Sequence, residues 1–96
     1  MTLEEIKSVL ALNKEDLRHR YKVKELGVFG SYAKDEQGTG SDLDILVDFE
    51  EPVGFFTFLE LEAHLEVLTQ LKVDLVTRKA LKPHIGAAIL KEVVYL

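Results

Sequence analysis

The chain has 96 residues, enough for one hydrophobic core and short for two domains, so we expect a single domain over residues 1–96. Hydrophobic residues make up 47% and charged residues 30%, and no apolar run is long enough to cross a membrane, so a cytoplasmic globular protein is expected. The net charge of −5 argues against direct nucleic-acid binding, and the lack of cysteine excludes disulfides and zinc–thiolate sites.

Hydrophobic spacing and turn residues divide the chain into three helices and three strands. Leu3, Ile6 and Leu10 recur at helical intervals, and Thr2 with Glu5 fits a capping box at the start of that helix. The expected elements are a helix from Leu3 to about Tyr21, strands at Val23–Phe29 and Leu43–Phe49, a helix from about Phe55 to Gln70, a strand at Lys72–Thr77 and a helix from about Pro83 to Val94.

The order of these elements predicts an α/β fold, with a small mixed β-sheet of about three strands and helices packed on it. The short connection between the first two strands favours antiparallel pairing. The helix between the second and third strands favours a parallel, right-handed crossover. Phe55, Phe56 and Phe58 are expected to pack in the core and at the start of the second helix, in preference to the alternative of a platform for base stacking.

Two acidic residues interrupt the strand at Leu43–Phe49. Asp42 and Asp44 are two positions apart, so their side chains point to the same side, while Leu43 and Ile45 point to the other. Carboxylates about 6–7 Å apart at their Cβ atoms repel each other unless a cation lies between them. Hard oxygen ligands of this kind suit Mg²⁺ or Mn²⁺.

A third acid, Asp74, lies within the apolar run "VDLV". If the third strand pairs beside the second, Asp74 lies next to Asp42 and Asp44, and three clustered acids are typical of two-metal phosphoryl or nucleotidyl transfer. The alternative is that these acids are merely solvated at strand ends, which we favour for Asp42 taken alone. The three together favour a functional site, whereas Asp48, farther along the strand, is interpreted as a solvated acid.

A small turn precedes the acidic strand. Gly30 would let the backbone approach a ligand closely, and Ser31 offers a hydroxyl followed by N–H groups that favour an anion. Lys34 would add a positive charge. A Gly-Ser turn is a weak signal alone, but here it suggests a triphosphate cradle beside the acids.

These residues together resemble the polymerase-β-like nucleotidyltransferase superfamily. Gly30-Ser31, a spacer and then Ser41-Asp42-Leu43-Asp44 match its signature, and the fuller form is similar to the minimal nucleotidyltransferase group. The resemblance extends from about Leu26 to Leu96. The segments that carry it are "GSYAK", "SDLDILVDF", "KVDLVT" and "LKPHIGAAILKEVVYL".

The resemblance implies a nucleotidyltransferase fold that binds ATP with Mg²⁺, two ions being expected. The implied nucleotide-binding residues are Gly30, Ser31, Lys34 and Ser41, and the implied metal ligands and catalytic residues are Asp42, Asp44 and Asp74, the last also as general base. The sequence departs from the family in one place: Asp35 follows Lys34 where the family usually has glycine. The added negative charge is expected either to weaken nucleotide binding or to face solvent.

Members of the minimal group are commonly antitoxins of HEPN-domain toxins, so the resemblance also implies a partner. It implies transfer of AMP to a toxin tyrosine, with binding alone by a catalytically weak antitoxin as the alternative. The last helix is apolar on more than one face, with Ile85, Ile89 and Val93 on one stripe and Leu90 and Val94 on another. Such a helix favours a homodimer or a hetero-oligomer, although a terminus packed into its own core would have the same pattern.

Overall fold

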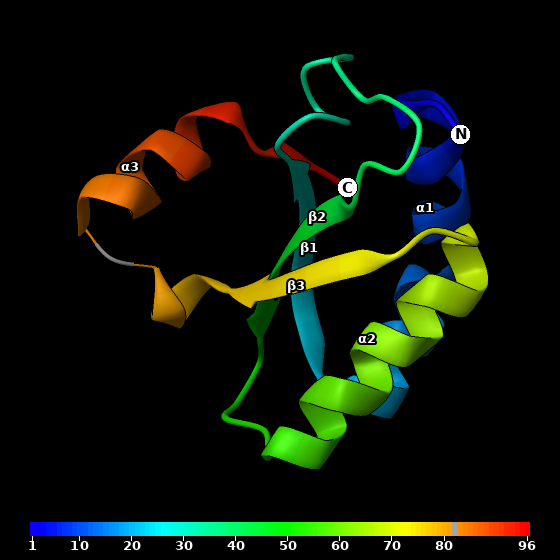
Figure 1. Cartoon of the computed structure of the whole chain (residues 1–96). Coiled ribbons are helices and arrows are strands. Elements are labelled where there is room, and N and C mark those ends of the chain that lie inside the picture. Colours follow the sequence, from blue (N-terminus) through cyan, green and yellow to red (C-terminus); the bar gives the residue numbers. More distant parts are fainter. Residues whose placement is uncertain (82) are drawn as a thin grey trace.

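The computed structural model describes residues 1–81 and 83–96, without the side chain of Ile85. Four strands form one mixed sheet in the order β3-β2-β1-β4, with β2 parallel to β3 and antiparallel to β1 (Figure 1). The elements are α1 (Leu3–Tyr21), β1 (Val23–Phe29), β2 (Leu43–Phe49), α2 (Phe55–Thr69), β3 (Val73–Thr77), the 3-10 turn η1 (Arg78–Ala80), α3 (Pro83–Glu92) and β4 (Val94–Tyr95). The predicted α/β class and strand directions are confirmed.

The first helix begins at the capping box that the sequence predicts. Thr2 Oγ1 accepts the N–H of Glu5 at 3.3 Å, and Glu5 Oε1 accepts the N–H of Thr2 at 2.9 Å. The helix ends where Lys22 adopts a left-handed conformation, with φ of 63°, and the chain turns into β1. The capping box thereby provides acceptors for two N–H groups at the start of the helix. The left-handed Lys22 ends the helix and directs the chain into β1.

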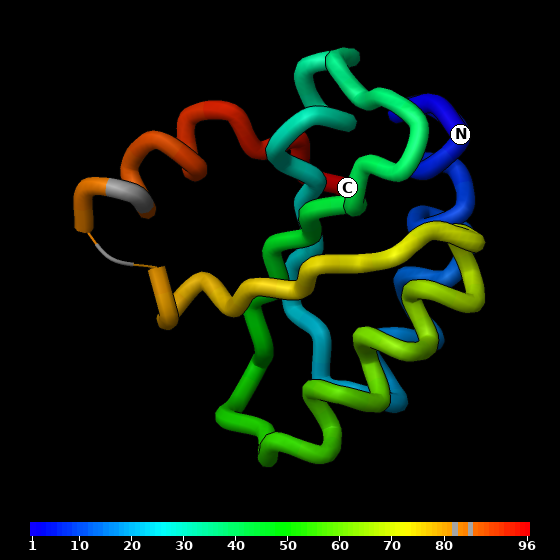
Figure 2. Tube along the Cα trace, viewed as in Figure 1, coloured from blue at the N-terminus to red at the C-terminus, as the bar shows by residue number. Residues whose placement is uncertain are grey.

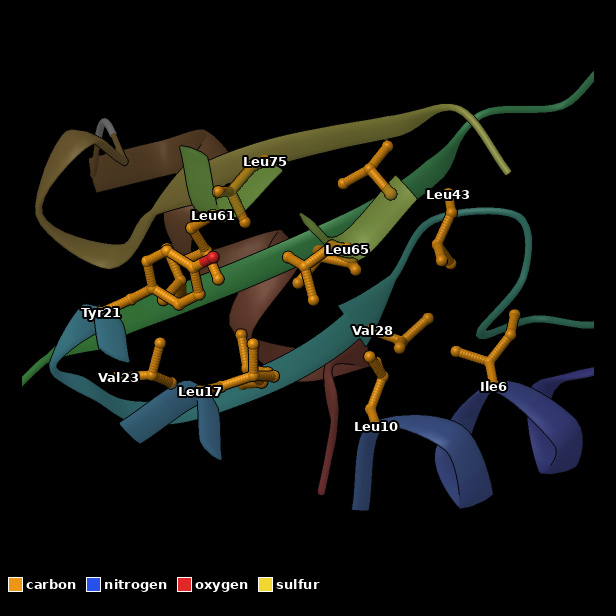
Figure 3. Packing of buried hydrophobic residues seen from close by; sticks show 14 of the residues in the cluster. Ile6, Leu10, Leu17, Tyr21, Val23, Val28, Leu43, Leu61, Leu65 and Leu75 are labelled. Atoms are coloured by element: carbon orange, nitrogen blue, oxygen red, sulfur yellow. The ribbon is translucent and has the colours of Figure 1, made fainter. Parts of the chain in front are cut away.

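Helices α1 and α2 lie together on one face of the sheet (Figure 1). Leu10 and Leu17 from α1 and Leu61 and Leu65 from α2 are fully buried against the strands, and Figure 3 shows these side chains pointing toward one another. The residues of β2 and β3 on this face are Leu43, Ile45, Val47, Val73 and Leu75. Because strand side chains alternate, burial of this set directs Asp44 and Asp74 to the opposite face of the sheet.

One edge of the sheet is β3, and two of its N–H groups donate to side chains of α2. Glu66 accepts the N–H of Val73 at 2.9 Å, and Glu62 accepts the N–H of Leu75 at 3.4 Å. An unpaired strand edge is a template for pairing with another chain, so these carboxylates both satisfy and shield it.

The C-terminal segment differs from the prediction. The last helix was expected to reach about Val94, but it ends at Glu92, and Val94–Tyr95 pair with β1 opposite Gly27 and Val28 as a fourth strand. The physical reason is that residue 27 of β1 is glycine. A Cβ at this position would overlap the side chain of Val93, so glycine lets the C-terminal segment lie close to β1. Backbone pairing with β1 therefore replaces the final helical turn.

Two of the expected core phenylalanines are at the surface, so that prediction is wrong for them. Phe55 is 71% exposed and Phe56 is 78% exposed, whereas Phe58 packs against the core. Phe55 and Phe56 belong to the first turn of α2, which projects beyond the end of β2. The fully buried residues that α2 contributes to the core include Leu61 and Leu65, which lie farther along the helix.

The last helix lies apart from α1 and α2, across the sheet from them (Figure 1). Much of its surface is open to solvent: Ala87, Ala88 and Leu90 are exposed, while Ile89 is half-buried. The predicted stripe also includes Ile85, whose side chain lies outside the described residues. None of the described helices combines the length and the hydrophobicity that crossing a membrane would require.

Candidate functional site

Two of the predicted acids meet across neighbouring strands. Asp44 on β2 and Asp74 on β3 are directly opposite each other in the parallel register, and their carboxyl groups are within hydrogen-bonding reach. Both belong to the sheet face that turns away from the hydrophobic core. Pairing of β2 with β3 therefore joins residues 30 positions apart, as the sequence predicts for this part of the cluster.

Burial and neighbouring negative charges act together on Asp44. Partial burial, the charges of Asp74 and Asp42, the hydrogen bond with Asp74 and the charge of Glu92 together raise the pKa of Asp44 from 3.8 to about 6. Asp42 and Asp74 are themselves exposed. The ionised state of the half-buried Asp44 is therefore costly when no cation is bound.

The acids fit a divalent cation that brings further ligands with it. Within residues 1–81 and 83–96, no three His, Cys, Asp or Glu side chains are gathered closely enough to hold an ion by themselves. Asp44 and Asp74 nevertheless form a close carboxylate pair whose repulsion a cation would relieve. Mg²⁺ typically takes one or two carboxylates together with substrate phosphates, so the donor set suits Mg²⁺ bound with a nucleotide.

The turn after β1 lies directly beside this pair. Gly30 has a left-handed conformation, with φ of 73°, and a Cβ built on it would overlap the carboxylate of Asp44. Glycine is required here for both reasons. Backbone bonds from the N–H of Lys34 to the carbonyl of Gly30, at 3.2 Å, and from Glu36 to Ser31, at 2.9 Å, close a single helical turn.

A residue that the sequence interpretation missed, Tyr32, anchors this turn. Its side chain is only 4% exposed and belongs to the hydrophobic core, between Ser31 and Ala33 in an otherwise polar segment. Burial of Tyr32 fixes the turn to the sheet, which holds Gly30 beside Asp44. An aromatic residue inside a polar, glycine-flanked turn is the sequence signal that could have indicated this role.

The turn binds an anion that belongs to the protein itself. Glu92, at the end of α3, accepts the N–H of Gly30 at 3.2 Å, and its other carboxylate oxygen lies 3.1 Å from Lys34 Nζ. The pKa of Lys34 is raised and that of Glu92 is lowered, in each case chiefly by the hydrogen bond between the two side chains. The contact shows that the Gly30 N–H and the Lys34 ammonium together bind a negatively charged carboxylate. No periodicity or motif in the sequence indicated Glu92.

The remaining candidates are more loosely connected with this centre. Ser41 Oγ accepts the N–H of Gly38 at 2.9 Å, so in this structure its hydroxyl closes the loop before β2. Asp35 is exposed and has a φ of 58°, in the left-handed region that glycine adopts most readily. Asp48 is half-buried near the far end of β2.

A hollow of about 330 Å³ lies at the opposite end of β2 from the acids. It opens between the ends of β2 and β3 and the start of α2, and contains none of the predicted site residues. Its lining includes Phe49, Val53, Phe55, Phe58, Thr77 and Arg78.

In a comparison with known proteins, a family model described as a nucleotidyltransferase domain matches residues 11–96 of this chain. The chain is 52% identical over 96 residues to the protein adenylyltransferase MntA of Thermococcus cleftensis, covering 100% of this chain and 97% of that protein.

Two solved structures share the fold. A structure described as a minimal nucleotidyltransferase is 34% identical, with a TM-score of 0.79, over 100% of this chain and 97% of that one. A Shewanella oneidensis complex of a tri-AMPylated HEPN toxin with its MNT antitoxin contains a chain that is 20% identical, with a TM-score of 0.68, over 94% of this chain and 70% of that one. At that identity the second likeness establishes the fold alone.

Proposed function

The chain belongs to the nucleotidyltransferase domain family, and on that premise we propose that it transfers AMP from ATP to a hydroxyl group of a partner protein. The observation that carries the proposal is the pairing of Asp44 with Asp74 beside a glycine turn that already holds a carboxylate. A phosphate-binding turn next to paired metal-type ligands is the arrangement that nucleotidyl transfer needs. The single minimal domain over residues 1–96 would carry out this transfer.

In the proposed mechanism the turn holds the nucleotide. The Gly30 N–H and the Lys34 ammonium bind phosphate oxygens, and Ser31 and Ser41 offer hydroxyls at the two ends of the intervening loop. Asp42, Asp44 and Asp74 would hold Mg²⁺, which when bound neutralises charge on the phosphates and lowers the pKa of an attacking hydroxyl.

Asp74 accepts the proton of the attacking hydroxyl in this scheme. It lies on the edge strand and is exposed, so an acceptor can approach it from solvent, whereas Asp44 is half-buried beneath the turn. The hydroxyl oxygen then attacks the α-phosphorus, and pyrophosphate leaves as the bond to the α-phosphate breaks. Fixed geometry supplies most of the acceleration, because the turn and the acids are held by the sheet.

We infer that the acceptor belongs to a HEPN toxin and is a tyrosine hydroxyl. The support is the 52% identical MntA, which is a protein adenylyltransferase, together with the MNT complex whose HEPN toxin carries AMP. The protein would then act as the antitoxin of a toxin–antitoxin pair. Oligomerisation of this chain through the exposed residues of α3 is a further expectation of the same proposal.

The test is transfer of labelled AMP from ATP to the protein encoded by the neighbouring gene, in the presence of Mg²⁺. We expect the double variant Asp42→Asn with Asp44→Asn to abolish transfer, and EDTA to do the same. Asp48→Asn is the matched control, because it removes the same charge from the same strand but away from Asp74. Transfer that persists in the double variant would refute the assignment of the acids.

A second candidate function is neutralisation by binding alone, favoured by the exposed apolar residues of α3. In that case the Asp42 and Asp44 double variant still inhibits the toxin. Truncation after Lys91 would also remove β4, so the better contact variant is Ala88→Glu, which adds a charge to an exposed position of the helix. Loss of inhibition in Ala88→Glu with inhibition retained in the double variant would identify binding as the mechanism.

A further inference from the structure

The end of α3 brings a carboxylate onto the phosphate-binding turn. Glu92 accepts the N–H of Gly30 through one oxygen and pairs with Lys34 through the other, at 3.2 and 3.1 Å. These are the backbone and side-chain donors assigned above to phosphate oxygens. We propose that Glu92 sets the nucleotide affinity of the site as an internal competitor: its carboxylate occupies a phosphate position in the free protein and leaves when the triphosphate binds. The inference rests on the proposed nucleotidyl transfer.

The backbone of Glu92 is held in place by the C-terminal strand. Beyond Glu92, β4 pairs with β1, and the N–H of Leu96 donates to the carbonyl of Leu26 at 3.1 Å. Lys14 Nζ donates to the carbonyl of Leu96 at 2.8 Å. Figure 2 shows the turn after β1 and the end of α3 at the same end of the molecule. Anchoring by β4 therefore keeps Glu92 beside the turn, and its side chain is the part that is free to move.

The contact is weak enough for a nucleotide to displace it. The side chain of Lys34 is 50% exposed and that of Glu92 is 28% exposed, and ion pairs in contact with solvent contribute little to stability. A triphosphate brings several negative oxygens where Glu92 brings a single carboxylate. Glu92 also adds negative charge near Asp44, and this repulsion weakens its own hold on the turn in the free protein.

If Glu92 only positioned Lys34, its substitution would have the opposite effect on nucleotide affinity. If Glu92 only held Lys34 ready for phosphate, its removal would free the lysine and weaken nucleotide binding. If Glu92 competes with phosphate, its removal leaves the Gly30 N–H and the Lys34 ammonium open and strengthens binding. The sign of the change in Kd therefore separates the two roles.

The experiment measures the Kd of ATP and of inorganic triphosphate, each with Mg²⁺, by titration calorimetry. The proteins are the wild type, Glu92→Gln, Glu92→Ala and the control Glu36→Gln. The charge of Glu36, like that of Glu92, acts on Lys34. The N–H of Gly30, however, donates to Glu92, so Glu36→Gln removes a nearby charge and leaves that hydrogen bond in place. We expect Kd to fall roughly threefold to tenfold in Glu92→Ala, from loss of one ion pair and one hydrogen bond. It should fall less in Glu92→Gln, which loses the ion pair but retains an acceptor for the Gly30 N–H, and change least in the control.

The amide resonance of Gly30 provides a second readout in the free proteins. It should shift when Glu92 becomes Ala, and again when triphosphate is added to either protein. An unchanged or raised Kd in both Glu92 variants, with ATP binding to the wild type, refutes competition by Glu92 and leaves the proposed nucleotidyl transfer standing. Absence of ATP binding in all four proteins refutes both competition by Glu92 and the proposed nucleotidyl transfer. Binding that appears only in the Glu92 variants supports the competitor directly.

Discussion

Substitution of Asp44 by Asn should stabilise the nucleotide-free protein. Asp44 is half-buried between Asp42, Asp74 and Glu92, and its pKa is raised from 3.8 to about 6. A raised folded-state pKa means that the folded protein binds a proton that the unfolded chain has released. The free energy of unfolding contributed by this group is therefore fully present below about pH 4 and is lost as the pH rises toward 6.

The magnitude follows from the two pKa values. At 1.36 kcal/mol per pKa unit, the change from 3.8 to about 6 corresponds to about 3 kcal/mol as an upper bound. Asp44 remains in contact with solvent, and screening reduces this to roughly 1–2 kcal/mol. Asn resembles the protonated carboxyl, so above pH 6 the variant should be more stable by that amount. For a chain of this length the melting temperature should rise by roughly 4–10 °C.

The assay is urea unfolding followed by far-UV circular dichroism at pH 4, 5, 6 and 7.5, with EDTA. Wild type and Asp44→Asn should coincide at pH 4 and separate progressively up to pH 6. Asp48→Asn is the control on the same strand, and its difference from wild type should stay small at every pH. A variant that is no more stable than wild type at pH 7.5, or a difference independent of pH, would refute the electrostatic reasoning.

Three further substitutions test the scaffold. Gly30→Ala should destabilise the protein by at least ~2 kcal/mol in thermal unfolding, since the φ of 73° and the overlap with Asp44 both oppose a Cβ, whereas Gly38→Ala, with open space around it, should cost under ~1 kcal/mol. Leu65→Ala should cost about 2–5 kcal/mol in urea unfolding, because the side chain is fully buried and leaves a cavity; a cost below 1 kcal/mol would contradict the described core. Glu66→Ala should cost about 1–2 kcal/mol and accelerate exchange of the Val73 amide hydrogen, while Glu66→Gln, which retains an acceptor, should lose less than half as much; equal losses would contradict the role of this bond.

Much of the fold was predictable because local signals agreed with one another. The capping box at Thr2, the helical stripe through Leu10 and the alternation around Leu43 each predict an element that the structure contains. Phe55 and Phe56 show where composition misleads, because an apolar residue in the first turn of a helix is buried only if the helix starts beneath another element. The strand β4 was missed since a two-residue strand has no period of its own.

The sequence by itself indicated the candidate residues for metal and phosphate binding, because the alternation around Asp42 and Asp44 and the Gly30-Ser31 turn are local patterns. Only the tertiary structure decided which of them meet. Asp74 reaches Asp44 because β2 and β3 pair in a particular register, and Tyr32 anchors the turn because the core has room for it. Glu92 reaches Gly30 across 62 positions because Gly27 lets the C-terminal strand lie against β1. Such contacts depend on distances through space, which no spacing along the chain records.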